Sequence, residues 1–253
     1  MLSSMGTPDR ISLRVEGQYS IPQIGDELIN KGSYEICVEG GQLILRHNST
    51  FRVLGSRFMF KSEDPSFSNY LRILNNSYGW TNYLGDMEVR LVDGGIRLIN
   101  HVFLEYYLYG VVPYEMSNSW PLEALKAQAI AARTYAVRCR SSYSYFDLYD
   151  TEVSQVYRGY DPSKQNAIQA VNETYSMVLK YDNDFASTYY SSSNGGRTEA
   201  CGNLWGESFP YLIVQDDFFD LASFLEAERL FDSDLVERVH RHLHIGKLNA
   251  RPV

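Results

Sequence analysis

One glutamate in an apolar setting has the type and surroundings that acid catalysis needs. Glu115 lies in the run GVVPYEM, residues 110–116, between valine, proline and aromatic neighbours. Apolar surroundings disfavour an ionised carboxyl group, and in this way an enzyme keeps a proton available for a leaving group. A solvated glutamate at the edge of a turn, with no chemical role, is the alternative. The pattern therefore offers Glu115 as a candidate general acid.

A loop rich in glycine and hydroxyl groups is the second candidate. Residues 191–198 read SSSNGGRT, in which Gly195 and Gly196 permit positive φ and close approach of the backbone to a ligand. Hydroxyl and N–H groups supply donors and acceptors without net charge, which suits a polyhydroxylated ligand. A phosphate site is a weak alternative, because the sequence has no GxxxxGK[ST] motif. A plain glycine-serine surface loop is the third interpretation.

Histidine and cysteine give weak patterns for a metal or a nucleophile. Three histidines alternate near the C-terminus, a pattern that binds metal only when further ligands join it. The cysteines have no CxxC spacing, so we expect small buried apolar side chains instead. The sequence also lacks the GxSxG elbow of a serine nucleophile. The residues concerned are His240, His242, His244, Cys37, Cys139 and Cys201.

The composition is that of an ordinary globular protein with an acidic net charge. Of the 253 residues, 44% are hydrophobic and 21% charged, and the formal net charge is -8. Phosphate binding needs clustered positive charge, so we expect no nucleic-acid partner. No segment reaches the ~18 uninterrupted apolar residues of a membrane span. The first residues show no basic segment followed by an apolar one, so we expect no signal peptide in this chain.

Short antiparallel strands are predicted for the first hundred residues. Residues Ile11 to Val15 alternate between apolar and polar side chains, the period of two that a half-buried strand requires. Glycine-rich turns at 39–41 and 93–95 separate further candidates and indicate hairpins. The other predicted strands are 33–38, 42–46, 51–53, 87–91 and 96–99.

A long helix is predicted over residues 120–140. Pro121 suits the first turn, where its missing N–H is not needed, and Glu123 favours the positive end of the helix dipole. Lys126 and Arg133 lie seven residues apart along one edge of the apolar face. The face itself consists of side chains at spacings of three and four, namely Leu122, Leu125, Ala129, Ala132 and Ala136.

Three shorter elements are predicted in the second half of the chain. Asp161 has the type of an N-cap and Pro162 that of a first helical residue, so a second helix is expected to begin there. A hairpin is predicted over 177–191, with its turn at 182–184. A short helix is expected from Asp232 or Ser233 through His242.

These elements predict a mixed α+β fold, in which a long helix packs on an antiparallel β-rich domain. We expect one domain over residues 10–220. Its β-rich N-terminal part, residues 10–100, forms a subdomain, and residues 100–220 form the catalytic part. Residues 221–253 are a tail to which the sequence gives no role.

Two blocks of the sequence resemble the signature of the stage II sporulation protein D family (SpoIID/LytB domain). The first block spans residues 99–137 and reads INHVFLEYYLYGVVPYEMSNSWPLEALKAQAIAARTYAV. The second contains DTEVSQVYRGY, YYSSSNGGRTE and LWGESFPYLIVQDD, in that order. Two blocks in one order at a plausible spacing make the resemblance specific. With the strands before them, it covers roughly residues 10–217.

The resemblance implies a lytic transglycosylase that cleaves MurNAc–GlcNAc bonds of peptidoglycan strands stripped of their stem peptides. It implies a role in engulfment during endospore formation and no cofactor. Other members are described as enhancers of a cell-wall amidase, a binding role that is the alternative here. The catalytic glutamate of the family's VxxEM segment corresponds to Glu115. We expect the glycan groove to be lined or shaped by Lys126, Arg133, Gln155, Tyr157, Ser191, Ser192, Gly195, Gly196 and Thr198.

The chain departs from the family at two places. Some members carry histidine and cysteine between the Asp-Thr and Gln-Val-Tyr pairs and hold a zinc ion there. This sequence has Glu152, Val153 and Ser154 at those positions and Tyr149 before them. Valine and serine are poor zinc ligands, so we expect no metal. Members are usually exported or anchored by an N-terminal hydrophobic segment, so an extracytoplasmic place at the cell wall is expected, although this chain shows no such segment.

Overall fold

The computed structural model describes residues 1–25 and 28–217. The chain divides into two compact units, Met1–Val178 and Leu179–Val253. The expected tail 221–253, its helix through His242 and the alternating histidines all lie outside the described residues. None of the helices within 1–25 and 28–217 has the length and apolarity that crossing a bilayer requires.

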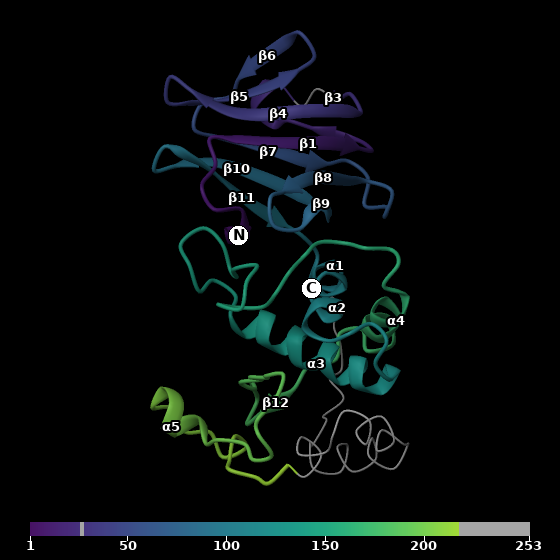
Figure 1. Ribbon diagram of the computed structural model, residues 1–253, viewed down its shortest axis with the longest axis vertical. Helices are drawn as coiled ribbons and strands as arrows, with labels where there is room; N and C mark the ends of the chain where they lie inside the picture. Colours follow the sequence, from purple (N-terminus) through teal and green to yellow (C-terminus); the bar gives the residue numbers. More distant parts are fainter. Residues whose placement is uncertain (26–27, 218–253) are drawn as a thin grey trace. The chain divides into compact units, whose positions relative to one another are not determined.

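Two antiparallel sheets form most of the first unit (Figure 1). The six-stranded sheet has the order β6-β5-β4-β1-β8-β9, and the five-stranded sheet has the order β11-β10-β7-β2-β3. The strands are β1 (Arg10–Glu16), β2 (Tyr19–Ser20), β3 (Leu28–Ile29), β4 (Gly32–Glu39), β5 (Gln42–His47), β6 (Thr50–Val53), β7 (Arg57–Ser62), β8 (Tyr70–Asn75), β9 (Gly79–Leu84), β10 (Asp86–Val92) and β11 (Gly95–His101). Two short 3-10 helices, Ser3–Met5 and Pro22–Ile24, accompany them.

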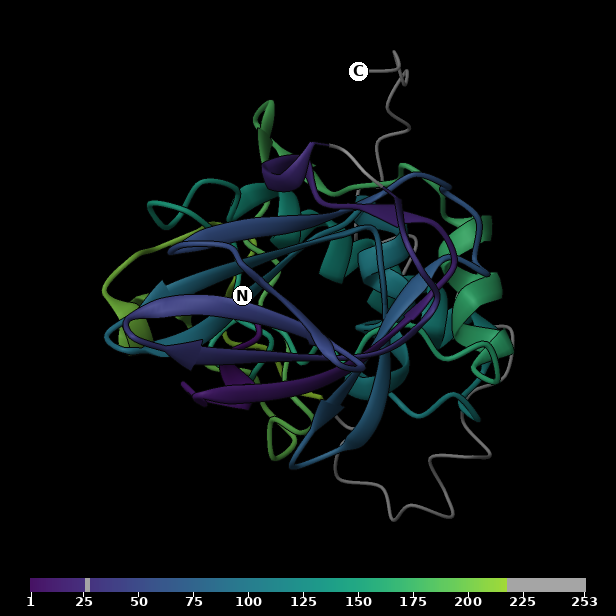
Figure 2. The ribbon, with the colours of Figure 1, turned by 90° about the horizontal axis from the view of Figure 1, so that it is seen from above.

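Alternating side chains of β1 are buried in the hydrophobic core between the two sheets. Ile11, Leu13 and Val15 are at most 2% exposed, which confirms the period-two prediction for this strand. They join Phe58 and Phe60 of β7, from the other sheet, in one buried cluster. Figure 2 shows the strands of both sheets curving around this interior. The six predicted strands are all present, which confirms the β-rich first hundred residues and the mixed α+β fold.

β1 is held on both sides and joined to distant parts of the chain. It pairs with β4 on one edge and with β8 on the other, both antiparallel. Just before it, Ser3 Oγ and the Ser4 N–H donate to Asp150 Oδ1 at 2.8 and 3.0 Å. The start of the described chain is therefore fastened to the loop around Asp150, which lies between the helices Leu122–Arg138 and Gln165–Glu173.

Four helices complete the first unit: α1 (Leu104–Tyr109), α2 (Val112–Glu115), α3 (Leu122–Arg138) and α4 (Gln165–Glu173). α3 confirms the predicted long helix. α4 begins later than predicted, and Asp161 is not its N-cap. The Asp161 carboxylate instead accepts the Ser163 N–H at 2.9 Å, and its carbonyl accepts the Lys164 N–H at 3.1 Å. This local turn competes with helix formation and delays the helix start.

The second unit contains β12 (Lys180–Tyr181), β13 (Asp184–Phe185) and α5 (Cys201–Trp205). Asp182 and Asn183 have φ of 51° and 69°, as a two-residue hairpin turn requires. The predicted hairpin is confirmed, but each of its strands has only two residues. Burial is confirmed for two of the cysteines, whereas the third, Cys139, is partly exposed.

Candidate functional site

Glu115 is the last residue of α2, a single helical turn fixed by buried apolar side chains. Val111 and Val112 are fully buried, and they anchor the turn to the core of the first unit. The Glu115 N–H donates to the Val111 carbonyl at 3.0 Å. The main chain at Glu115 is therefore set by the packing of its neighbours.

The Glu115 side chain is half-buried and meets the backbone of a distant segment. Its Oε1 accepts the Val156 N–H, with an N···O distance of 2.6 Å. Glu115 is therefore not a fully solvated side chain. The amide fixes the orientation of the carboxyl group relative to the segment 154–160.

The segment 154–160 alternates between buried and half-buried residues. Gln155 accepts the Tyr107 hydroxyl at 3.1 Å and donates to the Ala132 carbonyl at 3.3 Å. The Tyr157 hydroxyl donates to Asn100 Oδ1 at 2.7 Å. Burial raises the pKa of Tyr157 well above its ordinary value, so this hydroxyl stays protonated. Gln155 and Tyr157 face the interior and can influence a bound glycan only by positioning this segment.

Gly110, between α1 and α2, allows the segment to lie close to the helices. A Cβ atom at Gly110 would lie 2.5 Å from the Gly159 carbonyl oxygen and 2.5 Å from Cε2 of Tyr157. Both distances are far below van der Waals contact. The absence of a side chain at Gly110 is therefore what lets Val156 reach Glu115.

We expect Gly110→Ala to destabilise the protein by about 1–3 kcal/mol, the usual range for overpacking a filled site. The methyl group would displace backbone and a buried ring rather than a flexible side chain. Urea unfolding measures the change, with Gly202→Ala as control because its Cβ would meet nothing closer than 3.6 Å. Equal midpoints for the two variants would contradict the close approach.

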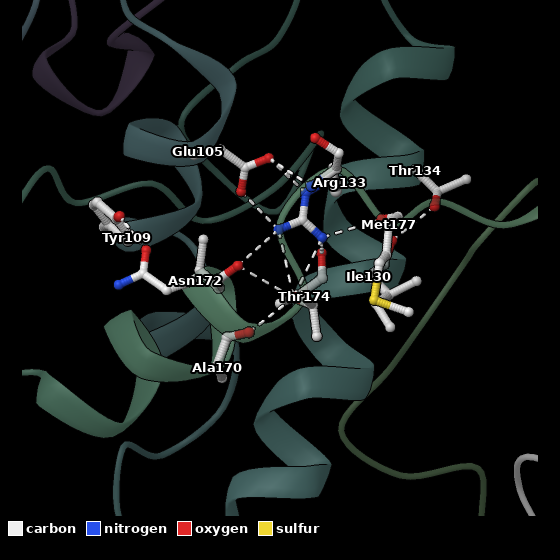
Figure 3. A network of polar contacts seen from close by, with 12 residues as sticks. Glu105, Tyr109, Ile130, Arg133, Thr134, Ala170, Asn172, Thr174 and Met177 are labelled. Atoms are coloured by element: carbon white, nitrogen blue, oxygen red, sulfur yellow. Dashed lines mark hydrogen bonds and ion pairs between the residues drawn. The ribbon is translucent and has the colours of Figure 1, made fainter. Parts of the chain in front are cut away.

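Arg133 lies inside the helical layer of the first unit (Figure 3). Its side chain is 1% exposed and forms a two-pronged ion pair with Glu105, with N···O distances of 2.7 and 2.9 Å. Nη1 also donates to the Met177 carbonyl at 3.1 Å and Nη2 to the Val171 carbonyl at 3.3 Å. A side chain buried to this degree does not line a groove. Arg133 can shape one only by joining α1, α3 and the end of α4.

Lys126 lies at the surface, in a different environment from Arg133. Its Nζ is 2.6 Å from Glu123 Oε1 and 2.6 Å from Glu173 Oε2. Hydrogen bonds to these two carboxylates raise the pKa of Lys126. The seven-residue spacing therefore does not give Lys126 and Arg133 a shared exposed edge.

The predicted loop 191–198 belongs to the second unit. Gly195 and Gly196 have φ of 70° and 90°, as their residue type allows. The Gly196 N–H donates to Asn194 Oδ1 at 2.9 Å, so part of the loop's donor capacity is used internally. Thr198 Oγ1 donates to the Ile213 carbonyl and accepts the Gln215 N–H, both at 2.8 Å. Ser191 and Ser192 are exposed.

The residues at the family's zinc positions do not fit a metal. The Ser154 hydroxyl accepts the Tyr149 N–H at 3.1 Å, and the Ser154 N–H donates to the Thr151 carbonyl at 2.9 Å. Val153 has no donor atom in its side chain and is 70% exposed. These residues close a turn instead. Within 1–25 and 28–217, no three His, Cys, Asp or Glu side chains gather as a metal site would require.

A group of aromatic and cationic side chains, which includes the chain neighbour of Glu115, was not predicted from the sequence. The Arg158 guanidinium carbon lies 4.3 Å from the ring centroid of Tyr78 and 5.5 Å from that of Tyr114. Lys164 Nζ lies 5.9 Å from the Tyr114 centroid. The alternation in the sequence QVYRGY was the available signal, because it places Arg158 opposite the buried Tyr157.

A family model described as "Stage II sporulation protein" (SpoIID) matches residues 92–181. The match includes Glu115 and the segment 154–160, whereas the loop 191–198 lies beyond it.

Three relatives are similar to this chain. An "Amidase enhancer" of Bacillus subtilis (strain 168) is 37% identical over 219 residues, which cover 85% of this chain and 29% of that protein. The "Stage II sporulation protein D" of the same organism is 33% identical over 131 residues, 45% of this chain and 38% of that protein. An uncharacterized protein of Brachyspira hyodysenteriae is 33% identical over 172 residues, 65% of this chain and 47% of that protein.

The chain spans less than half the length of each of these relatives. The two Bacillus subtilis names agree with the family model, and the model covers the helices that carry Glu115 and Arg133. On these grounds, the chain belongs to the stage II sporulation protein D family, whose model matches its residues 92–181.

Proposed function

We propose that this chain is a lytic transglycosylase of peptidoglycan, with Glu115 as its single acid and base. The observation that carries the proposal is the setting of Glu115 within the segment that matches the family model. There the carboxyl group is half-buried and oriented by the Val156 amide. A fixed, partly desolvated carboxyl group is what general acid catalysis requires. The relative named stage II sporulation protein D supports a role in spore formation.

The proposed reaction needs one carboxyl group, whereas glycoside hydrolysis usually needs two. Glu115, protonated at the oxygen that does not accept the Val156 N–H, gives its proton to the glycosidic oxygen. The bond between that oxygen and C1 of MurNAc then breaks. The resulting carboxylate takes the proton of the MurNAc 6-hydroxyl, whose oxygen bonds to C1. The products are a 1,6-anhydro-MurNAc end and a free GlcNAc hydroxyl, no water is consumed, and Glu115 is protonated again.

A second candidate function is supported by one relative. The protein that aligns with 85% of this chain is named an amidase enhancer. In this version the chain binds glycan strands without cleaving them and stimulates a cell-wall amidase. Both versions act on peptidoglycan, so we propose that the protein works outside the cytoplasmic membrane.

Product analysis separates the two functions. The purified protein is incubated with peptide-free glycan strands and, in parallel, with intact peptidoglycan, and soluble products are examined by mass spectrometry. We expect fragments ending in 1,6-anhydro-MurNAc from the peptide-free strands. Co-sedimentation with strands that remain whole would favour the amidase enhancer. Fragments with reducing MurNAc ends would contradict the intramolecular step. A protein that neither binds nor cleaves the strands would contradict both proposed functions.

A further inference from the structure

Two tyrosine rings and two cationic side chains form a group on the segments that carry Glu115 and its amide partner Val156. We call Tyr78, Tyr114, Arg158 and Lys164 the tyrosine–cation cluster. Arg158 lies between the two tyrosine rings, at 4.3 and 5.5 Å from their centroids, and Lys164 lies 5.9 Å from the Tyr114 centroid. Two cations thus share one aromatic ring, all within the first unit.

The Arg158 charge has no carboxylate partner among the residues that the structure describes. Its Nε is buried without a hydrogen-bond acceptor, and its guanidinium lies over the two tyrosine rings. Arg133 and Lys126, in contrast, each hold carboxylates at 2.6–2.7 Å. Arg158 therefore keeps its capacity to bind an anion through its terminal amino groups.

Asp161 is a second acidic side chain near the cluster, in addition to Glu115, and its carboxylate is engaged elsewhere. Burial raises the pKa of Tyr114, and the nearby Asp161 carboxylate adds to this rise while Arg158 opposes it. The Asp161 carboxylate accepts the Ser163 N–H at 2.9 Å. No ion pair joins it to Arg158 or Lys164 in the described part of the chain, so both cations remain available to a ligand.

The cluster is joined to the proposed catalytic group by covalent and hydrogen bonds. Tyr114 directly precedes Glu115 in α2. Arg158 lies two residues after Val156, whose N–H donates to Glu115 Oε1. Tyr78 is 39% exposed, and Arg158 and Lys164 are half-buried. The cluster and Glu115 thus belong to the same two segments of the chain, which the Val156 hydrogen bond joins.

We propose that the tyrosine–cation cluster binds the lactyl carboxylate of peptide-free MurNAc. This inference rests on the proposed action on peptidoglycan. In a strand that carries stem peptides, the lactyl carboxyl group is part of an amide bond and has no charge. Hydrolysis of that amide creates a carboxylate, which a guanidinium binds through charge-assisted hydrogen bonds. The cluster thus selects strands from which an amide-hydrolysing enzyme has already removed the peptides.

Binding measurements with one chemical change in the strand test this selection. Peptide-free strands are compared with the same strands after their lactyl carboxylates have been converted to methylamides. All proteins carry Glu115→Gln, so that no strand is cut during the measurement. We expect the free carboxylate to bind about 10- to 100-fold more tightly than the methylamide, with a preference that falls as salt rises.

Arg158→Met removes the charge and keeps a long apolar side chain between the rings. This variant is expected to bind the carboxylate strand only as tightly as the methylamide strand. Its affinity for the methylamide strand is expected to stay unchanged. Arg72→Met is the matched control, because Arg72 also lies over an aromatic ring, that of Trp80, at 5.8 Å. Lys164→Gln gives a second measure of the same site and is expected to reduce the preference in part.

Three outcomes would overturn the inference. The first is equal affinity for the two strands in the protein that carries Glu115→Gln alone. The second is equal weakening of both affinities by Arg158→Met, and the third is an unchanged preference in Lys164→Gln where Arg158→Met does not fold. The test needs binding alone. The Glu115→Gln protein could show a clear preference for the carboxylate strand while the unsubstituted protein forms no 1,6-anhydro ends. That pair of results would support this inference and contradict the transglycosylase proposal.

Discussion

Replacing Glu115 by glutamine is expected to abolish detectable strand cleavage and leave the fold intact. The amide oxygen of glutamine can still accept the Val156 N–H, so the local structure keeps its contact. The amide cannot give a proton to the glycosidic oxygen, and it cannot take one from the 6-hydroxyl. General acid–base catalysis contributes about 100- to 10,000-fold to a rate, and this factor is what the variant loses. The release of 1,6-anhydro ends per unit time measures it.

Glu35→Gln is the control for the Glu115 variant. Glu35 lies on β4, within an ion pair to the exposed Arg10, and has no part in the proposed site. Its variant is expected to cleave strands at the wild-type rate. Wild-type cleavage by Glu115→Gln, with both variants folded, would remove Glu115 from the mechanism. Loss of cleavage together with a lower melting temperature would instead indicate a structural role.

Replacing Arg133 by methionine is expected to destabilise the first unit strongly. Methionine fills much of the space of arginine but leaves the Glu105 carboxylate, 17% exposed, without its two-pronged partner. Removal of one member of a buried ion pair costs about 3–5 kcal/mol. For a chain of this size that loss lowers the melting temperature by roughly 6–20 °C. Thermal unfolding followed by circular dichroism measures the change.

Two further variants define what the Arg133 result means. Arg133→Met combined with Glu105→Gln removes the uncompensated charge and is expected to recover part of the lost stability. Arg10→Met breaks an exposed ion pair and is expected to leave the melting temperature unchanged. The affinity for glycan strands, measured where Arg133→Met is still folded, should match the wild type. If the fully folded Arg133→Met variant bound glycan strands more weakly than the wild type, Arg133 would have a role in strand binding.

Six of the strands were predicted from sequence, whereas β7, β8 and β9 were among those missed. β1 follows the alternation of apolar and polar residues closely. β9 does not, since Trp80 is 43% exposed while Thr81 is buried. β8 likewise exposes Leu74 and buries Asn75. β2 and β3 have two residues each, too few for a period to appear.

Local sequence was enough to propose Glu115 as a candidate. Its apolar neighbours adjoin it in the chain, and it corresponds to the glutamate of the family's VxxEM segment. The interior place of Arg133 depends on Glu105, on another helix, and helical spacing does not reveal this partner. Arg158 was missed for the same reason, because Tyr78 and Tyr114 reach it from separate parts of the fold.

The position of β1 between β4 and β8 determines the order in which the chain can fold as it leaves the ribosome. β1 and β4 can pair early, but the other edge of β1 stays open until β8 has been made. At about 5–20 residues per second, this interval lasts several seconds. An open strand edge is a template for pairing with other chains. One edge of β1 thus stays open to other chains until Tyr70–Asn75 emerges, and the Ser3 and Ser4 contacts form only after Asp150 has followed.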